Sequence, residues 1–207
     1  HEITTTSDLA QKFFDQGIRL VYAFNHEEAI TAFTEASRLD PDAPMPYWGV
    51  ALSLGPNINA AMDPKVEPRA VEAVQKATAR LSQATARERA YVEALAARYS
   101  AKKSVTRKAK DEAYAKAMRQ VAREAPDDAD AATIAAEAMM VLRPWDYWRA
   151  DGRPQPGMEE ILAILEAALR QHPDHPGACH YYIHAVEASP DPQRALDCAK
   201  RLPSLMP

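Results

Sequence analysis

The sequence predicts an all-helical protein built from consecutive pairs of helices. Its 207 residues include 41 Ala and only six Gly, and Ala is the strongest helix former whereas Gly is among the weakest. Apolar residues recur three or four positions apart in nearly every segment, which is the spacing of one face of a helix. Most of the 16 Pro lie between these segments, as Pro41, Pro126 and Pro173 do, where they end helices without breaking them.

The expected helices follow one another with short breaks. In the first, over residues 8–23, Phe14, Leu20 and Val21 lie at helical spacing. The second, over residues 27–39, ends before Pro41 because the residue preceding a proline disfavours the α conformation. We expect further helices over residues 45–54, 67–83, 85–99, 106–124, 129–142, 158–171, 177–188 and 192–202.

One spacing within the first two helices resembles a known repeat. Gly17, Ala29, Phe33, Ala36 and Pro41 are separated by 12, 4, 3 and 5 residues, which is similar to the tetratricopeptide repeat (TPR). The resemblance implies a right-handed α-solenoid of about five antiparallel helix pairs, in which neighbouring pairs stack because a single pair cannot bury its apolar face. We expect one such domain over residues 1–207. An irregular bundle of the same helix pairs is the alternative.

Several short segments narrow this resemblance to a bacterial group of tetratricopeptide proteins. The resemblance implies a curved solenoid that is often exported or periplasmic, and that usually continues beyond this length with further His-containing repeats. It implies no particular reaction. The segments are FNHEEA at 24–29, PYWG at 46–49, GPN at 55–57 and HYYIH at 180–184.

Three pairs carry insertions at the turn between their helices, over residues 55–64, 101–105 and 143–157. Such turns lie on one rim of a stack of hairpins, and insertions confined to one face often mark the binding face of a repeat protein. Loop growth without a role is the alternative. The third insertion contains Trp145, Asp146 and Trp148, and large aromatic residues are costly to leave exposed.

His180, His184 and Glu187 are the strongest candidate metal ligands. Their spacing of i, i+4 and i+7 places two imidazoles and a carboxylate on one stripe of a helix. This donor set suits Zn, Fe, Cu or Ni, although a complete site needs ligands from another element. Surface histidines that stack, or core histidines bonded to backbone, are the alternatives.

The repeat register implies a position for these residues. In tetratricopeptide proteins the first helix of each pair lines a concave groove, and the register places His180, His184 and Glu187 on that groove. The matching positions of other pairs imply an apolar, aromatic groove. Turn residues on the looped rim add possible ligands, although Asn57 and Asn59 also suit a turn beside Pro56. The further groove positions are Phe14, Tyr22, Trp48 and Glu137, and the rim residues are Asn25, His26, Asn57, Asn59 and Asp146.

Three functions are compatible with these features. The first is a scaffold that holds a peptide or protein segment in the groove. The second is a metal-binding protein or metalloenzyme, with Glu137 or Glu187 as general base. The third is a small-molecule binder with an aromatic wall of Trp48, Trp145 and Trp148.

Other classes lack support in the sequence. A net charge of −4 disfavours nucleic-acid binding, which depends on phosphate neutralisation, and no apolar run is long enough for membrane insertion. No phosphate loop, nucleophile elbow or Cys-x-x-Cys motif supports a common enzyme class. The last expected helix and the tail over residues 203–207 cannot provide a polar cap, so we expect a longer solenoid or self-association through the C-terminal repeat.

Overall fold

The computed structural model describes residues 1–99 and 105–206, and the described chain is all-helical apart from turns and two isolated β-bridges. The insertion expected at 101–105 lies outside the described residues, apart from Val105. The helices are α1 (Asp8–Tyr22), α2 (His26–Leu39), α3 (Pro44–Ser53), α4 (Glu67–Thr78), α5 (Ala86–Arg98), α6 (Arg107–Glu124), α7 (Ala129–Met140), α8 (Met158–Gln171), α9 (Pro176–Val186), the 3₁₀ helix η1 (Pro192–Ala195) and α10 (Leu196–Leu205).

Most helix boundaries lie close to their expected positions because local capping sets them. Ser7, Thr85 and Thr106 each accept a hydrogen bond from a backbone N–H in the first turn of α1, α5 and α6. Two ends differ. Helix α4 stops at Thr78, because the chain turns over residues 79–84 before Thr85 begins α5. The last helix continues to Leu205 with Pro203 inside it, where only the final turn loses a hydrogen bond.

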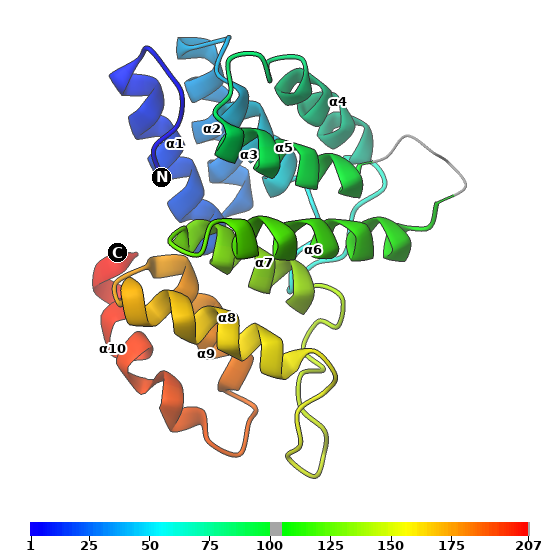
Figure 1. The fold of residues 1–207 in the computed structure, drawn as a ribbon, viewed down its shortest axis with the longest axis vertical. Coiled ribbons are helices and arrows are strands. Elements are labelled where there is room, and N and C mark those ends of the chain that lie inside the picture. Colours follow the sequence, from blue (N-terminus) through cyan, green and yellow to red (C-terminus); the bar gives the residue numbers. More distant parts are fainter. Residues whose placement is uncertain (100–104, 207) are drawn as a thin grey trace.

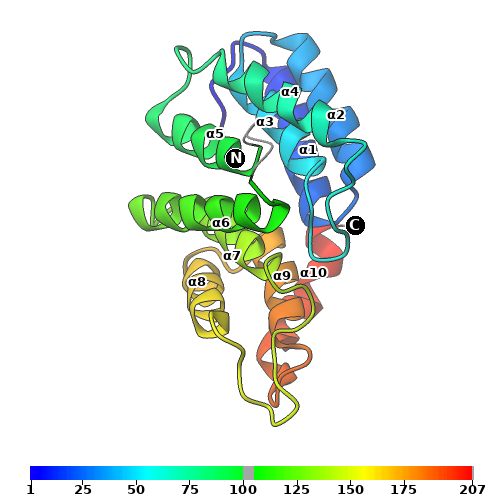
Figure 2. The same ribbon diagram turned by 90° about the vertical axis from the view of Figure 1, so that its right-hand side faces the viewer.

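The helices pack as five consecutive antiparallel pairs, which confirms the predicted fold class. The pairs are α1 with α2, α3 with α4, α5 with α6, α7 with α8 and α9 with α10, and each pair also contacts the next (Figures 1 and 2). The repeat spacing has a direct steric reason. A Cβ atom on Gly17 or on Gly49 would lie 2.5 or 2.6 Å from the Phe33 ring, so both positions need glycine for α1, α2 and α3 to approach closely.

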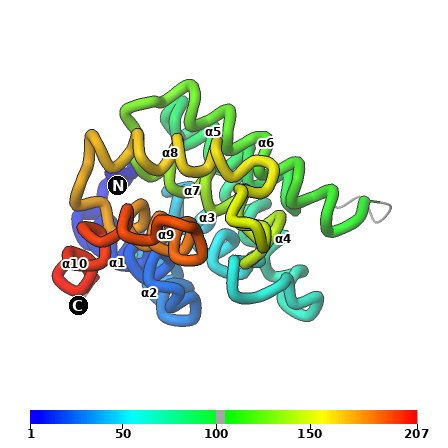
Figure 3. Tube along the Cα trace, turned by 90° about the horizontal axis from the view of Figure 1, so that it is seen from below, coloured from blue at the N-terminus to red at the C-terminus, as the bar shows by residue number. Residues whose placement is uncertain are grey.

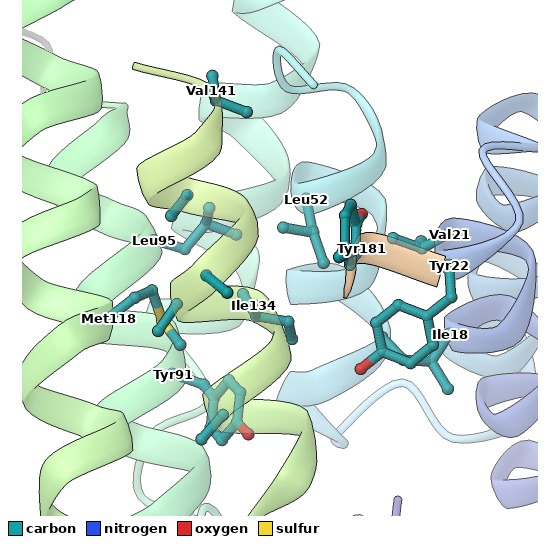
Figure 4. Close-up of a cluster of buried hydrophobic side chains, with 14 of the residues drawn as sticks. Ile18, Val21, Tyr22, Leu52, Tyr91, Leu95, Met118, Ile134, Val141 and Tyr181 are labelled. Atoms are coloured by element: carbon teal, nitrogen blue, oxygen red, sulfur yellow. The ribbon is translucent and has the colours of Figure 1, made fainter. Parts of the chain in front are cut away.

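The stack closes on itself. Helix α1 of the first pair contacts α9 of the last pair, and Figure 3 shows α1, α9 and α10 together at one end of the molecule. A Cβ on Gly177 would lie 2.6 Å from the Tyr22 ring, so this contact also requires a glycine. Side chains from both ends of the chain share one core, in which Tyr22 and Tyr181 face residues of α3 and α7 (Figure 4).

This closure changes the expected groove. The inner face of the stack is filled with side chains where the repeat register implied an open surface, and Tyr22, Trp48 and Glu137 are 2%, 1% and 7% exposed. Phe14 is also fully buried. The repeat register in the sequence predicts which face of a helix points inward, but it does not predict the radius of the superhelix. Here the radius is small enough for α1 to contact α9. No helix in the described parts of the chain has the length and apolarity needed to cross a bilayer.

Candidate functional site

The turn after α1, the end of α9 and the loop at 143–157 meet at one edge of the molecule. We call the side chains of His180, His184 and Glu187 at this edge the rim cluster. The helical spacing brings all three together, as the sequence indicated. His180 is half-buried, whereas His184 and Glu187 have 19% and 46% of their side-chain surface exposed. The cluster is therefore sheltered on one side and open to solvent on the other.

The two imidazoles of the rim cluster converge through their Nε2 atoms, which are 3.1 Å apart. Each Nδ1 atom faces an oxygen. His180 Nδ1 lies 2.5 Å from the carbonyl oxygen of Tyr22, and His184 Nδ1 lies 2.8 Å from Glu187 Oε1. Because a carbonyl and a carboxylate only accept hydrogen bonds, both Nδ1 atoms carry a proton. In the neutral rings, the Nε2 lone pairs then point at one another.

Two lone pairs at this distance repel unless a cation lies between them. A proton on one Nε2 atom is one solution, and a metal ion is the other. Burial lowers the pKa of His180, so its Nε2 atom is held in the unprotonated form that binds metals. Histidine ligands usually donate their other ring N–H to a carbonyl or carboxylate, which is the pattern at both imidazoles.

Aromatic side chains with unusual backbone conformations enclose the cluster. Phe24 and Trp145 have φ of 59° and 63°, and they are the two non-glycine residues with positive φ in the described chain. The Phe24 ring lies 4.6 Å from His180 and 5.7 Å from His184, and the Trp145 ring lies 5.1 Å from His184, between ring centroids. Residues forced into the left-handed region cluster at functional sites.

The Phe24 conformation has an identifiable origin. Phe24 N–H bonds to Val21 O and Asn25 N–H bonds to Leu20 O, which is the pattern of a Schellman motif. Glycine usually occupies the left-handed position of this motif because it has no Cβ. Phenylalanine here costs backbone energy and places an aromatic ring against both histidines.

His26 lies beside this group, on the turn that also carries Phe24. Its ring is 6.2 Å from the Phe24 ring, and neither of its buried ring nitrogens has a hydrogen-bond partner among the described residues. Burial lowers the pKa of His26, which keeps the ring neutral. Asn25 is exposed, and its side chain makes no cap bond to α2. It lines a cavity of about 580 Å³ between α1 and the end of α10.

The other rim residues mainly shape their loops. Asn57 Oδ1 accepts hydrogen bonds from the N–H groups of Asn59 and Ala60. Asn57 therefore stabilises a turn, which was the alternative to its role as a ligand. Asp146 accepts from Arg143 and Gln155 within the third insertion. Trp148 Nε1–H donates to Ala185 O at 2.8 Å and fastens this loop to α9.

Sequence reasoning missed two buried polar groups. Arg98 is fully buried, with its guanidinium 3.9 Å above the Tyr114 ring. Asp130 bonds to His1 and His175 at the N-terminal end of α7. The sequence signal for the second group was the acidic run before α7, where an N-cap is expected. Its partners come from distant parts of the chain, and no local pattern indicates them.

Five antiparallel pairs in a closed stack define this chain as an all-α helical-repeat protein. No family model and no curated protein matches its sequence. Over 97% of its length it is similar to two solved structures of MamA, described as "MamA RS-1 ArsTM double mutant" and "MamA 41-end from Desulfovibrio magneticus RS-1". Each has 16% identity and a TM-score of 0.44, with 96% and 97% of those chains covered. Membership of the bacterial tetratricopeptide group stays a prediction.

Proposed function

We propose that this protein is a helical-repeat scaffold that binds one divalent transition metal ion between the Nε2 atoms of His180 and His184. The observation that carries the proposal is the 3.1 Å separation of these atoms. Zn–N bonds of 2.0–2.1 Å in a tetrahedral site separate neighbouring nitrogens by about 3.3 Å. An ion therefore needs only a small movement of the two rings.

The outer contacts support the same proposal. The Tyr22 carbonyl and the Glu187 carboxylate fix the tautomers that leave both Nε2 atoms free to bind. Glu187 then serves to orient His184, and not as a direct ligand as the sequence suggested. Two imidazoles leave coordination positions open. His26, on the same turn as Phe24, is a sequence-predicted candidate for a further ligand, because its ring nitrogens are buried and unpaired in the described structure.

Metal titration of protein purified without an affinity tag tests this function. We expect Zn²⁺ to bind, and His180→Gln or His184→Gln to weaken its affinity at least about tenfold. Glu187→Gln should weaken the Zn²⁺ affinity about 10- to 100-fold, which is the usual effect of removing a residue that hydrogen-bonds to a metal ligand. The exposed His172 provides the matched control, in the variant His172→Gln, because this residue is the C-cap of α8 and precedes the start of α9, whereas His184 and Glu187 lie at the end of α9. Equal numbers of bound Zn²⁺ ions with equal affinity in wild type and in the His180→Gln/His184→Gln variant would contradict the proposal.

Nitrogen NMR of the imidazoles gives a second readout. The metal-free protein should show His180 with its proton on Nδ1, and Zn²⁺ should shift the Nε2 resonances of His180 and His184 together. A shift confined to His172 or His26 would place the ion elsewhere. Because ligand histidines must be neutral, affinity should fall as the pH drops.

A protein partner at the same rim is the second candidate function. Trp145 is 49% exposed, although its backbone is strained and its ring packs edge-on against His184. Exposed tryptophans are favoured anchors at protein interfaces. With the inner face filled, this rim replaces the concave groove as the proposed docking surface for a peptide or protein segment. Trp145→Ala should abolish capture of such a segment and leave the far-UV spectrum unchanged.

The small-molecule alternative has less support. Trp48 packs against Phe14 and Tyr91 in the core, Trp145 against His184, and Trp148 bonds to Ala185. The three tryptophans thus contact three separate sets of neighbours and form no common wall. Self-association through the C-terminal repeat also stays a prediction, for which Leu196, 50% exposed on α10, is the apolar candidate contact.

A further inference from the structure

A second polar cluster lies at the N-terminal end of α7, away from the rim cluster along α9. We call His1, Asp128 and Asp130 the inner cluster. One ligand atom from each residue lies within 4.8 Å of the other two. These atoms are an imidazole nitrogen and two carboxylate oxygens, and they come from the first residue of the described chain and from the start of α7.

Asp130 is the centre of this cluster and is held in its ionised form. Its Oδ2 atom lies 2.8 Å from His1 Nδ1, while Oδ1 accepts from His175 Nε2 at 3.0 Å and from the Tyr22 hydroxyl. His175 Nδ1 accepts the N–H of Ala178, so the ring proton is on Nε2. Burial alone would raise the pKa of Asp130, but the bonds from His175 and Tyr22 lower it below its usual value.

Asp128 brings an unpaired oxygen to the same place. It is the N-cap of α7, and its Oδ1 atom accepts the N–H of Ala131 at 3.0 Å. Its Oδ2 atom is buried without a hydrogen-bond partner in the described chain, and the Nε atom of Arg87 is 3.6 Å away. Burial raises the pKa of Asp128, and the neighbouring charge of Asp130 raises it further.

Tyr91 adds a second orphan polar atom. The residue is fully buried, and its hydroxyl faces the Asp128 carboxylate but makes no hydrogen bond with it or with any other described group. Figure 4 shows the Tyr91 hydroxyl at the N-terminal end of α7, and its ring packs edge-on against His1 with centroids 5.5 Å apart. Buried polar groups without partners are rare in native proteins, because each costs about 1–3 kcal/mol.

We propose that the inner cluster is a second cation site, in which His1 Nδ1, Asp128 Oδ2 and an Asp130 oxygen bind one divalent ion such as Zn²⁺. One imidazole with two carboxylates is a common donor set for Zn²⁺ and also suits Mn²⁺. Donors around a tetrahedral Zn²⁺ ion are about 3.3 Å apart, so the ligand atoms, which all lie within 4.8 Å of one another, need to move by at most about 1.5 Å. In the metal-free protein His1 Nδ1 donates to Asp130 Oδ2, so an ion would replace this hydrogen bond and leave the proton of the neutral His1 ring on Nε2.

The surrounding contacts fit this assignment. His175 and Tyr22 orient Asp130 from outside, as second-shell groups orient metal-ligating carboxylates. The N-terminal segment is also bonded to α5, where Thr4 donates from its N–H and its hydroxyl to Glu88, both at 2.6 Å. An ion in the inner cluster would link this segment to the start of α7.

Equilibrium dialysis with Zn²⁺ alone tests the site in the His180→Gln/His184→Gln variant, which removes the rim cluster. We expect one Zn²⁺ to remain bound. Adding Asp128→Asn should weaken that binding at least about tenfold. Asn keeps the helix cap through its side-chain oxygen but removes the negative charge, so the far-UV spectrum and thermal midpoint of the metal-free protein should stay the same.

Two neighbouring residues sharpen the test. Arg87→Gln removes the cation that faces Asp128 Oδ2, so Zn²⁺ should bind several-fold more tightly. Asp127→Asn is the matched control, because Asp127 is an exposed carboxylate one residue away, and it should leave the affinity unchanged. Absence of Zn²⁺ binding in the rim-deficient variant, or equal affinity with and without Asp128→Asn, would overturn the inner site. Neither result bears on the rim cluster, which is tested separately by the loss of one bound Zn²⁺ between wild type and the His180→Gln/His184→Gln variant.

Discussion

Glu137 is a carboxyl group that α7 carries into the interior of the stack. Its surroundings include Arg98, which is fully buried, and the ring of Tyr114 beneath that guanidinium. Burial raises the pKa of Glu137 to about 7, against the opposing effect of the Arg98 charge. The sequence suggested Glu137 as a general base on an open groove. The structure instead makes it an enclosed group whose ionisation is costly near neutral pH.

A pH-dependent stability follows from Glu137. The unfolded chain releases this proton near pH 4.5 and the folded chain near 7, so between these values the folded state binds more protons. The contribution of Glu137 to stability therefore falls as the pH rises through this window, by about 3 kcal/mol in total. Glu137→Gln lacks the ionisable group. The free energy of urea unfolding of this variant, minus that of wild type, should therefore rise by this amount between pH 4 and pH 8. A constant difference across that range would show that Glu137 is not buried as described.

The residues that flank the rim cluster show what sequence can and cannot predict at this scale. The spacing of His180, His184 and Glu187 is local, and a regular helix is enough to bring them together. Phe24 contacts the same site although it precedes His180 by 156 residues in the sequence. Its left-handed backbone conformation is one that glycine usually adopts. A pattern search finds the histidines but has no signal for such a partner.

At the scale of helices, the sequence predicted well which segments form helices and where these helices lie in the chain. Both properties depend on residues that are close together in the sequence. Apolar periodicity, capping residues and prolines lie within a few residues of each boundary. The contact of α1 with α9 was not predictable in this way. It depends on the small change of angle from one pair to the next, which accumulates over the whole stack. This contact is also why Tyr22 and Trp48 are core residues and not groove residues.

Gly177 provides a test of the α1–α9 contact. Ala at this position gains about 1 kcal/mol of helix propensity, but its Cβ would lie 2.6 Å from the Tyr22 ring. Overpacking of this kind costs about 1–3 kcal/mol, so Gly177→Ala should lower the free energy of unfolding in spite of the better propensity. In a Tyr22→Ala background the same change should be neutral or stabilising. Equal destabilisation in both backgrounds would place the clash elsewhere.

At the scale of the molecule, closure should alter how the chain unfolds. An open solenoid contacts only its neighbours, so its ends can unfold separately. Here Tyr22 of the first pair bonds to Asp130 of α7 and packs on Gly177 of α9, while His180 bonds back to the Tyr22 carbonyl. These contacts connect the two ends of the stack and favour a single cooperative transition.

Single-tryptophan variants can measure this coupling. Trp48 contacts Phe14 and Tyr91 and reports on the first three pairs, whereas Trp148 bonds to Ala185 and reports on the last two. Variants that keep only one of these residues should unfold in urea with coincident midpoints. Tyr22→Ala removes the closing contact, so the two midpoints should then separate.

A core change outside the closing contact is the control for that separation. Phe33 lies against Gly17 and Gly49 within the first two pairs, so Phe33→Leu removes packing without touching α9. It should destabilise the protein by about 1–3 kcal/mol and move both tryptophan midpoints together, because the ends of the stack remain joined. Coincident midpoints in Tyr22→Ala would mean that the neighbour contacts alone make the chain cooperative, and that closure fills the inner face without coupling the two ends.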